Sequence, residues 1–312
     1  MRDPSIPGTR GEGYGEARSD GALTMVGAQL EAPVTASGAT DAAVATGLEE
    51  HRLAHRALPG RDLAEVDLAT MLLGAELAAP LVVDVPAGAA AAPFARAATE
   101  QGLALVAGEE GARLQDRPPL LLARLPGRAL LDGPEPAERL VALCGAHGVL
   151  VELDPVGEAL ASAGRVAREE HVAAVCRALA PLPVVVREAG SGLDGADARA
   201  LQALGAAAVD VGGAGSRPAG DPAFTGWGVR LAEAVSEAAL MAPALPIVAG
   251  GPLHDGVQAA MCLALGATVA APRLDPEEDA AEAVAAVLHQ LRVAVWACGA
   301  PSASALHPGL LR

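Results

Sequence analysis

The segment Pro183–Arg217 constrains the fold more than any other part of the chain. An apolar run, Val184–Val186, ends in a charged pair and a glycine-rich turn. A helix-like stretch, Asp194–Leu204, then leads to a second apolar run, Ala207–Val211, that also ends in glycines. This order of run, helix and run is a βαβ unit, whose two strands are parallel. Polar groups just past such strand ends form the functional sites of α/β proteins, so we expect the site there.

The same alternation recurs along most of the chain. Eight apolar runs are predicted as strands: Leu81–Val85, Leu103–Ala107, Leu120–Leu125, Val149–Leu153, Val184–Val186, Ala207–Val211, Ile247–Ala249 and Thr268–Ala271. The stretches predicted as helices are Ala90–Gln101, Pro136–His147, Val166–Ala180, Asp194–Leu204, Val229–Met241, Val257–Leu265 and Glu277–Ala297, with a short turn at Glu110–Gln115. Eight strands alternating with helices over roughly 230 residues predict an α/β fold, the (β/α)8 TIM barrel. An open doubly wound sheet would favour a GxGxxG motif after the first strand, where this chain has DVPAGAA instead.

The first 46 residues have a different composition from the rest. They are rich in Gly, Ala, Ser, Thr and Pro and lack regular periodicity, which predicts a disordered tail. We therefore divide the chain into a tail, residues 1–46, and a barrel domain, residues 47–312, with a short helix expected near Leu48–Ala57. No signal peptide is predicted, because Met1–Gly13 contains no apolar run. No membrane span is predicted either, because the Ala-rich run Val85–Ala98 is interrupted by prolines and an arginine.

The charge composition excludes one class of partner. The net charge is −16 and the chain has no basic cluster, which argues against nucleic-acid binding. All 22 basic residues are arginines, so no lysine is present to form a Schiff base or act as a base. The four cysteines are far apart without metal-ligand spacing, which is typical of reduced thiols in a cytoplasmic protein. An anionic substrate would need local arginines or a metal ion.

Polar and glycine residues follow most of the predicted strands. Side chains alternate along a strand, so Glu152 and Asp154 should share a face while Arg187 and Glu188 point to opposite faces. The predicted mouth of the barrel contains Asp84, Glu109, Glu110, Arg124, Glu152, Asp154, Arg187, Glu188, Asp210, Gly213, Gly250, Gly251 and Arg273.

Each candidate at this mouth also has a structural interpretation. Arg187 and Glu188 are candidate catalytic residues or a salt-bridged strand end. Glu152 and Asp154 are candidates for an acid/base pair or a metal-binding pair, or they are solvated loop carboxylates. The glycines at 212, 213 and 215, like those at 250 and 251, suit a phosphate-binding turn or a tight βα turn.

Several segments in the right order resemble one family. VDLATMLLGAELAAPLVVDVPAGA, starting at Val66, is similar to VDLST–LG–L–API–AMTGG of the type 2 isopentenyl-diphosphate isomerases. PVVVREAGSG, starting at Pro183, is similar to PVIVKEVGxG, and AVDVGGAGSR to IDVxGxGGT. HRALPG, VELDPVGE, GWG and LPIVAGG complete the series. The resemblance covers about residues 48–300.

The resemblance implies an FMN-dependent TIM barrel that interconverts isopentenyl and dimethylallyl diphosphate. It further implies NADPH to reduce the flavin, Mg²⁺ to hold the diphosphate, and a homo-oligomer. Arg187 takes the place of the family's lysine, and Glu158 that of its metal ligand. Arg187, Gly213, Gly215, Gly250 and Gly251 are then the cofactor-binding candidates, and Arg187, Glu188 and Glu152 the catalytic ones.

The chain departs from the family pattern at many functional positions. HxNxxQE has become Glu152, Asp154, Gly157 and Glu158, and the phosphate-binding SGG has become Gly250-Gly251-Pro252. Proline removes an N–H donor, and the extra carboxylates repel anions. Three hypotheses remain: an active isomerase with rewired contacts, a catalytically inactive, flavin-free partner or regulatory protein, and a barrel with a new small-molecule role. The tail is a further candidate, for docking to a protein scaffold.

Overall fold

The computed structural model describes residues 45–86, 88–162, 165–214 and 221–312. The predicted tail, residues 1–46, lies outside this part of the chain except for its last two residues, so the tail stays a prediction. The predicted site residue Gly215 also lies outside the described residues.

The TIM barrel is confirmed. Its eight strands are β3 (Val82–Asp84), β4 (Ala104–Ala107), β5 (Leu120–Pro126), β6 (Gly148–Leu153), β7 (Val184–Glu188), β8 (Ala208–Asp210), β9 (Ile247–Ala249) and β10 (Val269–Ala270). Each strand pairs in parallel with the next one in the chain. A parallel bridge between Leu81 and Ala270 joins the last strand to the first and closes the ring. All eight predicted strands are present, with boundaries that differ by a residue or two.

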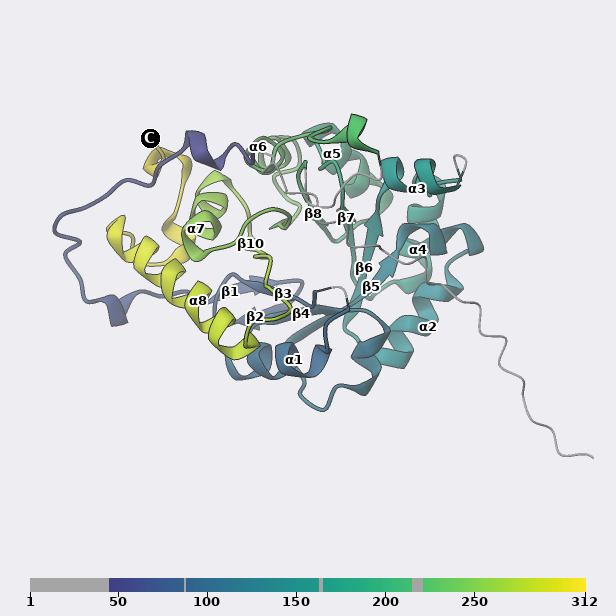
Figure 1. Ribbon diagram of the computed structural model, residues 1–312, viewed down its shortest axis with the longest axis horizontal. Helices are drawn as coiled ribbons and strands as arrows, with labels where there is room; N and C mark the ends of the chain where they lie inside the picture. Colours follow the sequence, from purple (N-terminus) through teal and green to yellow (C-terminus); the bar gives the residue numbers. More distant parts are fainter. Residues whose placement is uncertain (1–44, 87, 163–164, 215–220) are drawn as a thin grey trace, which may run out of the picture. The chain divides into compact units, whose positions relative to one another are not determined.

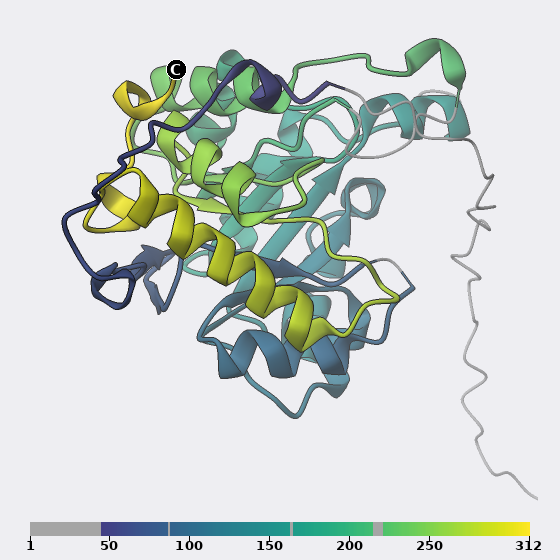
Figure 2. The ribbon, with the colours of Figure 1, turned by 60° about the vertical axis from the view of Figure 1, so that its left-hand side comes forward.

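Helices surround the strands (Figure 1). They are α1 (Ala91–Glu100), α2 (Glu135–Cys144), α3 (Pro155–Ser162), α4 (Glu169–Leu179), α5 (Gly195–Leu204), α6 (Leu231–Met241), α7 (Gly256–Leu265) and α8 (Ala280–Ala297). The longest, α8, packs between α1 and α7 (Figure 2). Asp194, Asp255 and Asp279 begin α5, α7 and α8 by accepting backbone N–H bonds with their side chains, as N-cap residues do. No helix in the described part of the chain is long and apolar enough to cross a membrane.

The alternation of side chains along the strands builds two separate cores. Val82, Leu122, Leu150 and Val185 point into the barrel with their counterparts on the other strands. The residues between them, such as Val151, point outward and pack under the helices. Because side chains alternate with a period of two, the residue two positions after each inward residue also points inward, now at the carboxyl end of its strand.

Three elements differ from the predictions. Strands β1 (Thr70–Leu72) and β2 (Ala75–Leu77) form an antiparallel hairpin that was not predicted, and its Leu72 and Leu77 pack against the barrel's inner core. The hairpin turn has positive φ at Leu73 and Gly74. Leucine rarely adopts this conformation, so its presence in the sequence does not indicate a turn. Helix α3 was also not predicted. The predicted short helix at Leu48–Ala57 is wrong: only η1 (Leu48–Glu50), a 3₁₀ turn, forms, because Leu53 bridges to Leu311 in extended conformation.

Candidate functional site at the carboxyl ends of the strands

Inward-pointing charged residues close the barrel at the carboxyl ends of its strands. Arg187 on β7 donates from Nε to Asp210 Oδ2 on β8 at 2.7 Å, and from a terminal nitrogen to Asp84 Oδ2 on β3 at 2.6 Å. Strands β3 and β7 are the first and fifth of the ring, so the Arg187–Asp84 pair crosses the barrel. Arg187 is 8% exposed and Asp210 fully buried.

A second arginine extends this network. Arg124 on β5 donates to the other oxygen of Asp84 at 2.9 Å and to the carbonyl of Val85 at 3.1 Å. Its second terminal nitrogen lies 3.7 Å from a carboxylate oxygen of Glu110. We call Asp84, Arg124, Arg187 and Asp210 the ion-pair layer. Two arginines and two aspartates balance within it, so its charges are neutralised inside the barrel.

Electrostatics keep Arg187 charged. Burial lowers the pKa of this guanidinium, but the carboxylates of Asp210 and Asp84 outweigh the burial, and the net pKa lies above the ordinary value. The guanidinium is therefore a permanent cation, and Asp210 and Asp84 are its hydrogen-bonded partners. The interpretation of Arg187 as part of a salt-bridged strand end is thus realised in the structure.

Glu188, the next residue on β7, is on the opposite face, as predicted from strand alternation. Its Oε2 accepts N–H bonds from Gly190, Ser191 and Gly192, the first at 3.0 Å. Its Oε1 is buried and has no hydrogen-bond partner in the described part of the protein. Burial, opposed by these N–H groups and aided by nearby Asp154, raises the pKa of Glu188 to about 7.

The predicted acidic candidates Glu152, Asp154 and Glu158, at the end of β6 and the start of α3, have different contacts. Glu152 lies beside Arg187 in the strand register and raises its pKa. Asp154 accepts the N–H of Gly157 at 2.9 Å at the start of α3, and Glu158 accepts that of Arg128 at 3.0 Å. Among the described residues no group of three or more His, Cys, Asp or Glu side chains is arranged to hold a metal ion. The structure thus gives Asp154 and Glu158 roles in holding loops.

The predicted phosphate-binding glycines do not present a free cradle. Barrels of this kind bind phosphate at the loops after the seventh and eighth strands, here β9 and β10, with free N–H groups. Gly250 N–H instead donates to Asp210 Oδ1 at 3.1 Å, and Gly212 N–H donates to the same oxygen at 3.2 Å. Pro252 has no N–H, which leaves Gly251 as the one residue of the stretch 250–254 whose N–H has no acceptor among the described residues.

The neighbouring N–H groups are also occupied. Arg273 N–H bonds to the carbonyl of Leu253, and Pro272 has no donor. At the start of α7, Asp255 accepts the N–H groups of Val257 and Gln258, while Gly256 donates to Gln290. An incoming phosphate would have to displace a carboxylate of the chain itself. These N–H groups of the described residues, apart from that of Gly251, are therefore not free to receive the phosphate of FMN.

The structure adds three residues that sequence reasoning placed at the mouth without a role: Asp84, Arg124 and Asp210. Their signal was present in the sequence as the period of two, because each follows an inward apolar residue by two positions. What the sequence did not reveal is that these side chains pair with one another across the ring.

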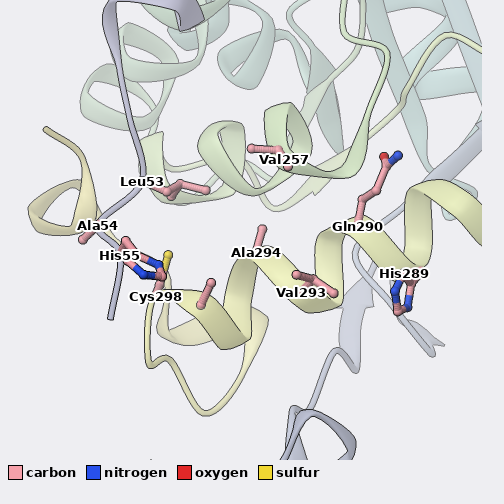
Figure 3. A pocket seen from close by; sticks show the side chains of 10 residues that line it. Leu53, Ala54, His55, Val257, His289, Gln290, Val293, Ala294 and Cys298 are labelled. Carbon is pink, nitrogen blue, oxygen red and sulfur yellow. The ribbon is translucent and has the colours of Figure 1, made fainter. Parts of the chain in front are cut away.

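A cavity of about 430 Å³ lies away from the mouth, in the helical layer (Figure 3). It is bounded by α7, α8 and the extended segment of residues 53–55, and its surface is almost wholly apolar. None of the predicted site residues lines it. Its lining residues are Leu53, Ala54, His55, Val257, His289, Gln290, Val293, Ala294, Ala297 and Cys298.

Comparison with solved structures supports the fold. An oxidised active mutant of (S)-mandelate dehydrogenase superposes with a TM-score of 0.67 at 16% identity, covering 85% of this chain and 88% of that one. A mandelate oxidase mutant with benzaldehyde gives 0.67 at 22% identity, covering 86% and 87%. At these identities the similarity shows the barrel alone.

Comparison by sequence identifies relatives of nearly full length, although no family model matches the chain. An isopentenyl-diphosphate delta-isomerase of Xanthobacter autotrophicus is 35% identical, covering 88% of this chain and 93% of the relative. Isomerases of Mycolicibacterium vanbaalenii and Cronobacter sakazakii are each 33% identical, covering 84% and 86% of this chain. Identity at this level extends over the strands, helices and motifs described above, and the chain therefore belongs to the isopentenyl-diphosphate delta-isomerase family, of the type 2 kind that its motifs predict.

Proposed function

We propose that this family member is a catalytically inactive, flavin-free barrel that acts by binding other proteins and not by isomerising prenyl diphosphates. One observation carries the proposal: Arg187, at the position of the family's lysine, directs its donors to Asp84 and Asp210. A cation committed to two carboxylates of the barrel is not available to a flavin or a phosphate.

Charge at the mouth supports the same conclusion. Within the ion-pair layer the charges balance, and Glu110, Glu152 and Asp154 add negative charge around it. Two like unit charges about 5 Å apart repel by roughly 3 kcal/mol at an effective dielectric constant of about 20. FMN and a prenyl diphosphate would together bring several negative charges to this region, where Arg124 and Arg187 are already paired with carboxylates of the chain.

The test is turnover by the purified full-length chain. Isopentenyl diphosphate is supplied with reduced FMN and Mg²⁺, and dimethylallyl diphosphate is measured, beside an active isomerase of the family as the positive control. We expect a colourless preparation and no product above the enzyme-free rate. A yellow preparation that forms product would overturn the proposal.

A second candidate function is retained isomerisation, and the state of Glu188 favours it. A carboxyl group with a pKa of about 7 suits proton transfer near neutral pH. FMN, NADPH, Mg²⁺ and a prenyl diphosphate would then be required, as the resemblance implies. If wild type is active and Glu188→Gln is not, while Glu237→Gln on α6 keeps its activity, this second function replaces the first.

The partner of an inactive barrel remains to be found, and the chain offers two places to look. We propose a homo-oligomer, which size measurement in solution tests, and docking of residues 1–46 to a protein scaffold in the cytoplasm. Deletion of residues 1–46 should abolish co-localisation with that scaffold and leave folding of the barrel intact. Unchanged localisation after the deletion would reject the docking role.

A further inference from the structure

Glu188 is bound at one oxygen and unsatisfied at the other. Its Oε2 gathers three consecutive backbone N–H groups, those of Gly190, Ser191 and Gly192. Its Oε1 is shielded from solvent and lacks a partner among the described residues, and the whole residue is 7% exposed. A buried carboxylate oxygen without a donor is costly when charged, but the cost falls when that oxygen carries a proton.

The loop that Glu188 holds is itself a clamp on two other segments. Ser191 forms an antiparallel bridge with Ala214, after β8, and its carbonyl accepts the N–H of Val229 at 2.8 Å. Ala214 N–H bonds to the carbonyl of Val229 at 2.8 Å. Gly192 has a φ of +81°, and a Cβ there would lie 2.9 Å from Gly213 Cα, so the contact is close backbone packing. The carboxyl group of Glu188 thus holds together three segments: the one that follows β7, the one that follows β8 and the one that precedes α6.

Among the described residues, the charged group that faces Glu188 is another carboxylate, that of Asp154. A Cβ built on Gly190 would lie 3.1 Å from Asp154 Oδ1 and 3.8 Å from Glu188 Oε1, which places Gly190 between the two side chains. The other charged groups on the surrounding elements are engaged elsewhere. They are Arg187 (with Asp84 and Asp210), Glu152 (beside Arg187), Asp194 (capping α5), Arg230 (with Glu50 and Glu233) and Glu237 (accepting the N–H of Gly195).

We propose that Glu188 is a proton-operated latch on the mouth of the barrel. With a proton on Oε1 the neutral side chain keeps the segments 190–192, 212–214 and 227–229 docked together. Loss of that proton leaves a buried anion beside Asp154, and the segments separate more often so that the anion reaches water. The latch is independent of whether the barrel binds a flavin, because it lies on the face of β7 opposite the ion-pair layer.

The sign of the pH effect follows from linkage. The docked state holds the proton up to a pKa of about 7, whereas the ordinary pKa of a solvated glutamate is 4.5. Protons therefore favour the docked state, and docking weakens as pH rises towards and through 7. Between pH 6 and pH 8 the ratio of docked to open states should fall about tenfold.

Hydrogen exchange of the full-length chain tests the latch. Peptides that cover residues 189–193 and 212–214 are followed by mass spectrometry at pH 6 and pH 8, with labelling times scaled for the intrinsic exchange rate. In wild type, protection of these peptides should fall about tenfold from pH 6 to pH 8, while strand β5 should not change. In Glu188→Gln, which keeps an acceptor oxygen and cannot titrate, the pH dependence should vanish. In the control Glu237→Gln it should remain.

Three outcomes would overturn the proposal: equal protection of the wild-type peptides at both pH values, an unchanged pH dependence in Glu188→Gln, or a parallel loss of protection throughout the barrel. Should Glu188→Gln fail to fold, the carboxyl carbon of Glu188 in labelled wild type is titrated by NMR instead. Titration near pH 7 supports the latch, and titration below pH 5 rejects it.

Discussion

Arg187 and Glu188 are neighbours on β7 and face opposite electrostatic situations. Arg187 points into the barrel, where Asp84 and Asp210 match its charge and its donors. Glu188 points to the loops, where one oxygen has three donors and the other has none. A step of one residue along β7 therefore leads from the ion-pair layer, whose charges are paired, to Glu188, a carboxyl group that can titrate. The comparison indicates that the inner layer supports the fold and that the outer face retains the capacity to respond to conditions.

The largest effect should come from breaking the inner layer. Arg187→Met leaves Asp210 buried without its cation and Asp84 with Arg124 as its one arginine partner, and we expect the free energy of unfolding to fall by about 3–5 kcal/mol. Urea denaturation measures the change. Arg230→Met is the matched control, because Arg230 makes its ion pairs at the surface and should change stability little. Equal losses in the two variants would mean that the ion-pair layer contributes no more than a surface pair.

Substitution of Glu188, on the outer face of β7, should have a smaller effect, seen in how the unfolding free energy depends on pH. The pKa of Glu188 is about 7 in the folded protein, against an ordinary value of 4.5 for a solvated glutamate. Its contribution to stability is therefore fully present below pH 4.5 and is lost as pH rises through 7. Between pH 5 and pH 8 this linkage is worth about 2–3 kcal/mol. The fall in unfolding free energy between pH 5 and pH 8 should be smaller in Glu188→Gln than in wild type by this amount. An identical pH dependence in wild type and Glu188→Gln would show that Glu188 does not change its protonation on unfolding in this range.

Much of this comparison was accessible from the sequence. The period of two predicted that Arg187 and Glu188 diverge, and the eight apolar runs predicted the barrel that places both residues at its mouth. The pairing of Arg187 with Asp84 was not accessible, because the two residues are far apart in the chain and meet only when the first and fifth strands face each other. The hairpin β1–β2 was missed for a local reason: its turn uses Leu73 at positive φ, where sequence patterns expect glycine or asparagine.

The smallest effects should come from two single glycine-to-alanine variants, one beside the ion-pair layer and one beside Glu188. In Gly250→Ala the new Cβ would collide with the buried carboxylate of Asp210, and we expect a loss of about 1–3 kcal/mol. In Gly190→Ala the Cβ would be 3.1 Å from Asp154 Oδ1, on a half-exposed loop that can shift by a few tenths of an ångström. We expect a loss of less than about 1 kcal/mol there. Thermal unfolding of both variants checks the order, and a reversed order would mean that the inner layer is the more adaptable region.

The inference to be tested is that Arg124, Arg187 and the N–H groups of Gly212 and Gly250, all at the mouth, are already bound to carboxylates of the chain. Its most direct test is an equilibrium titration of FMN fluorescence with the purified full-length protein at low salt. The account predicts no saturable change up to about 100 μM protein, which corresponds to a binding free energy weaker than about −5.5 kcal/mol. Saturable quenching with a dissociation constant in the low micromolar range would contradict it.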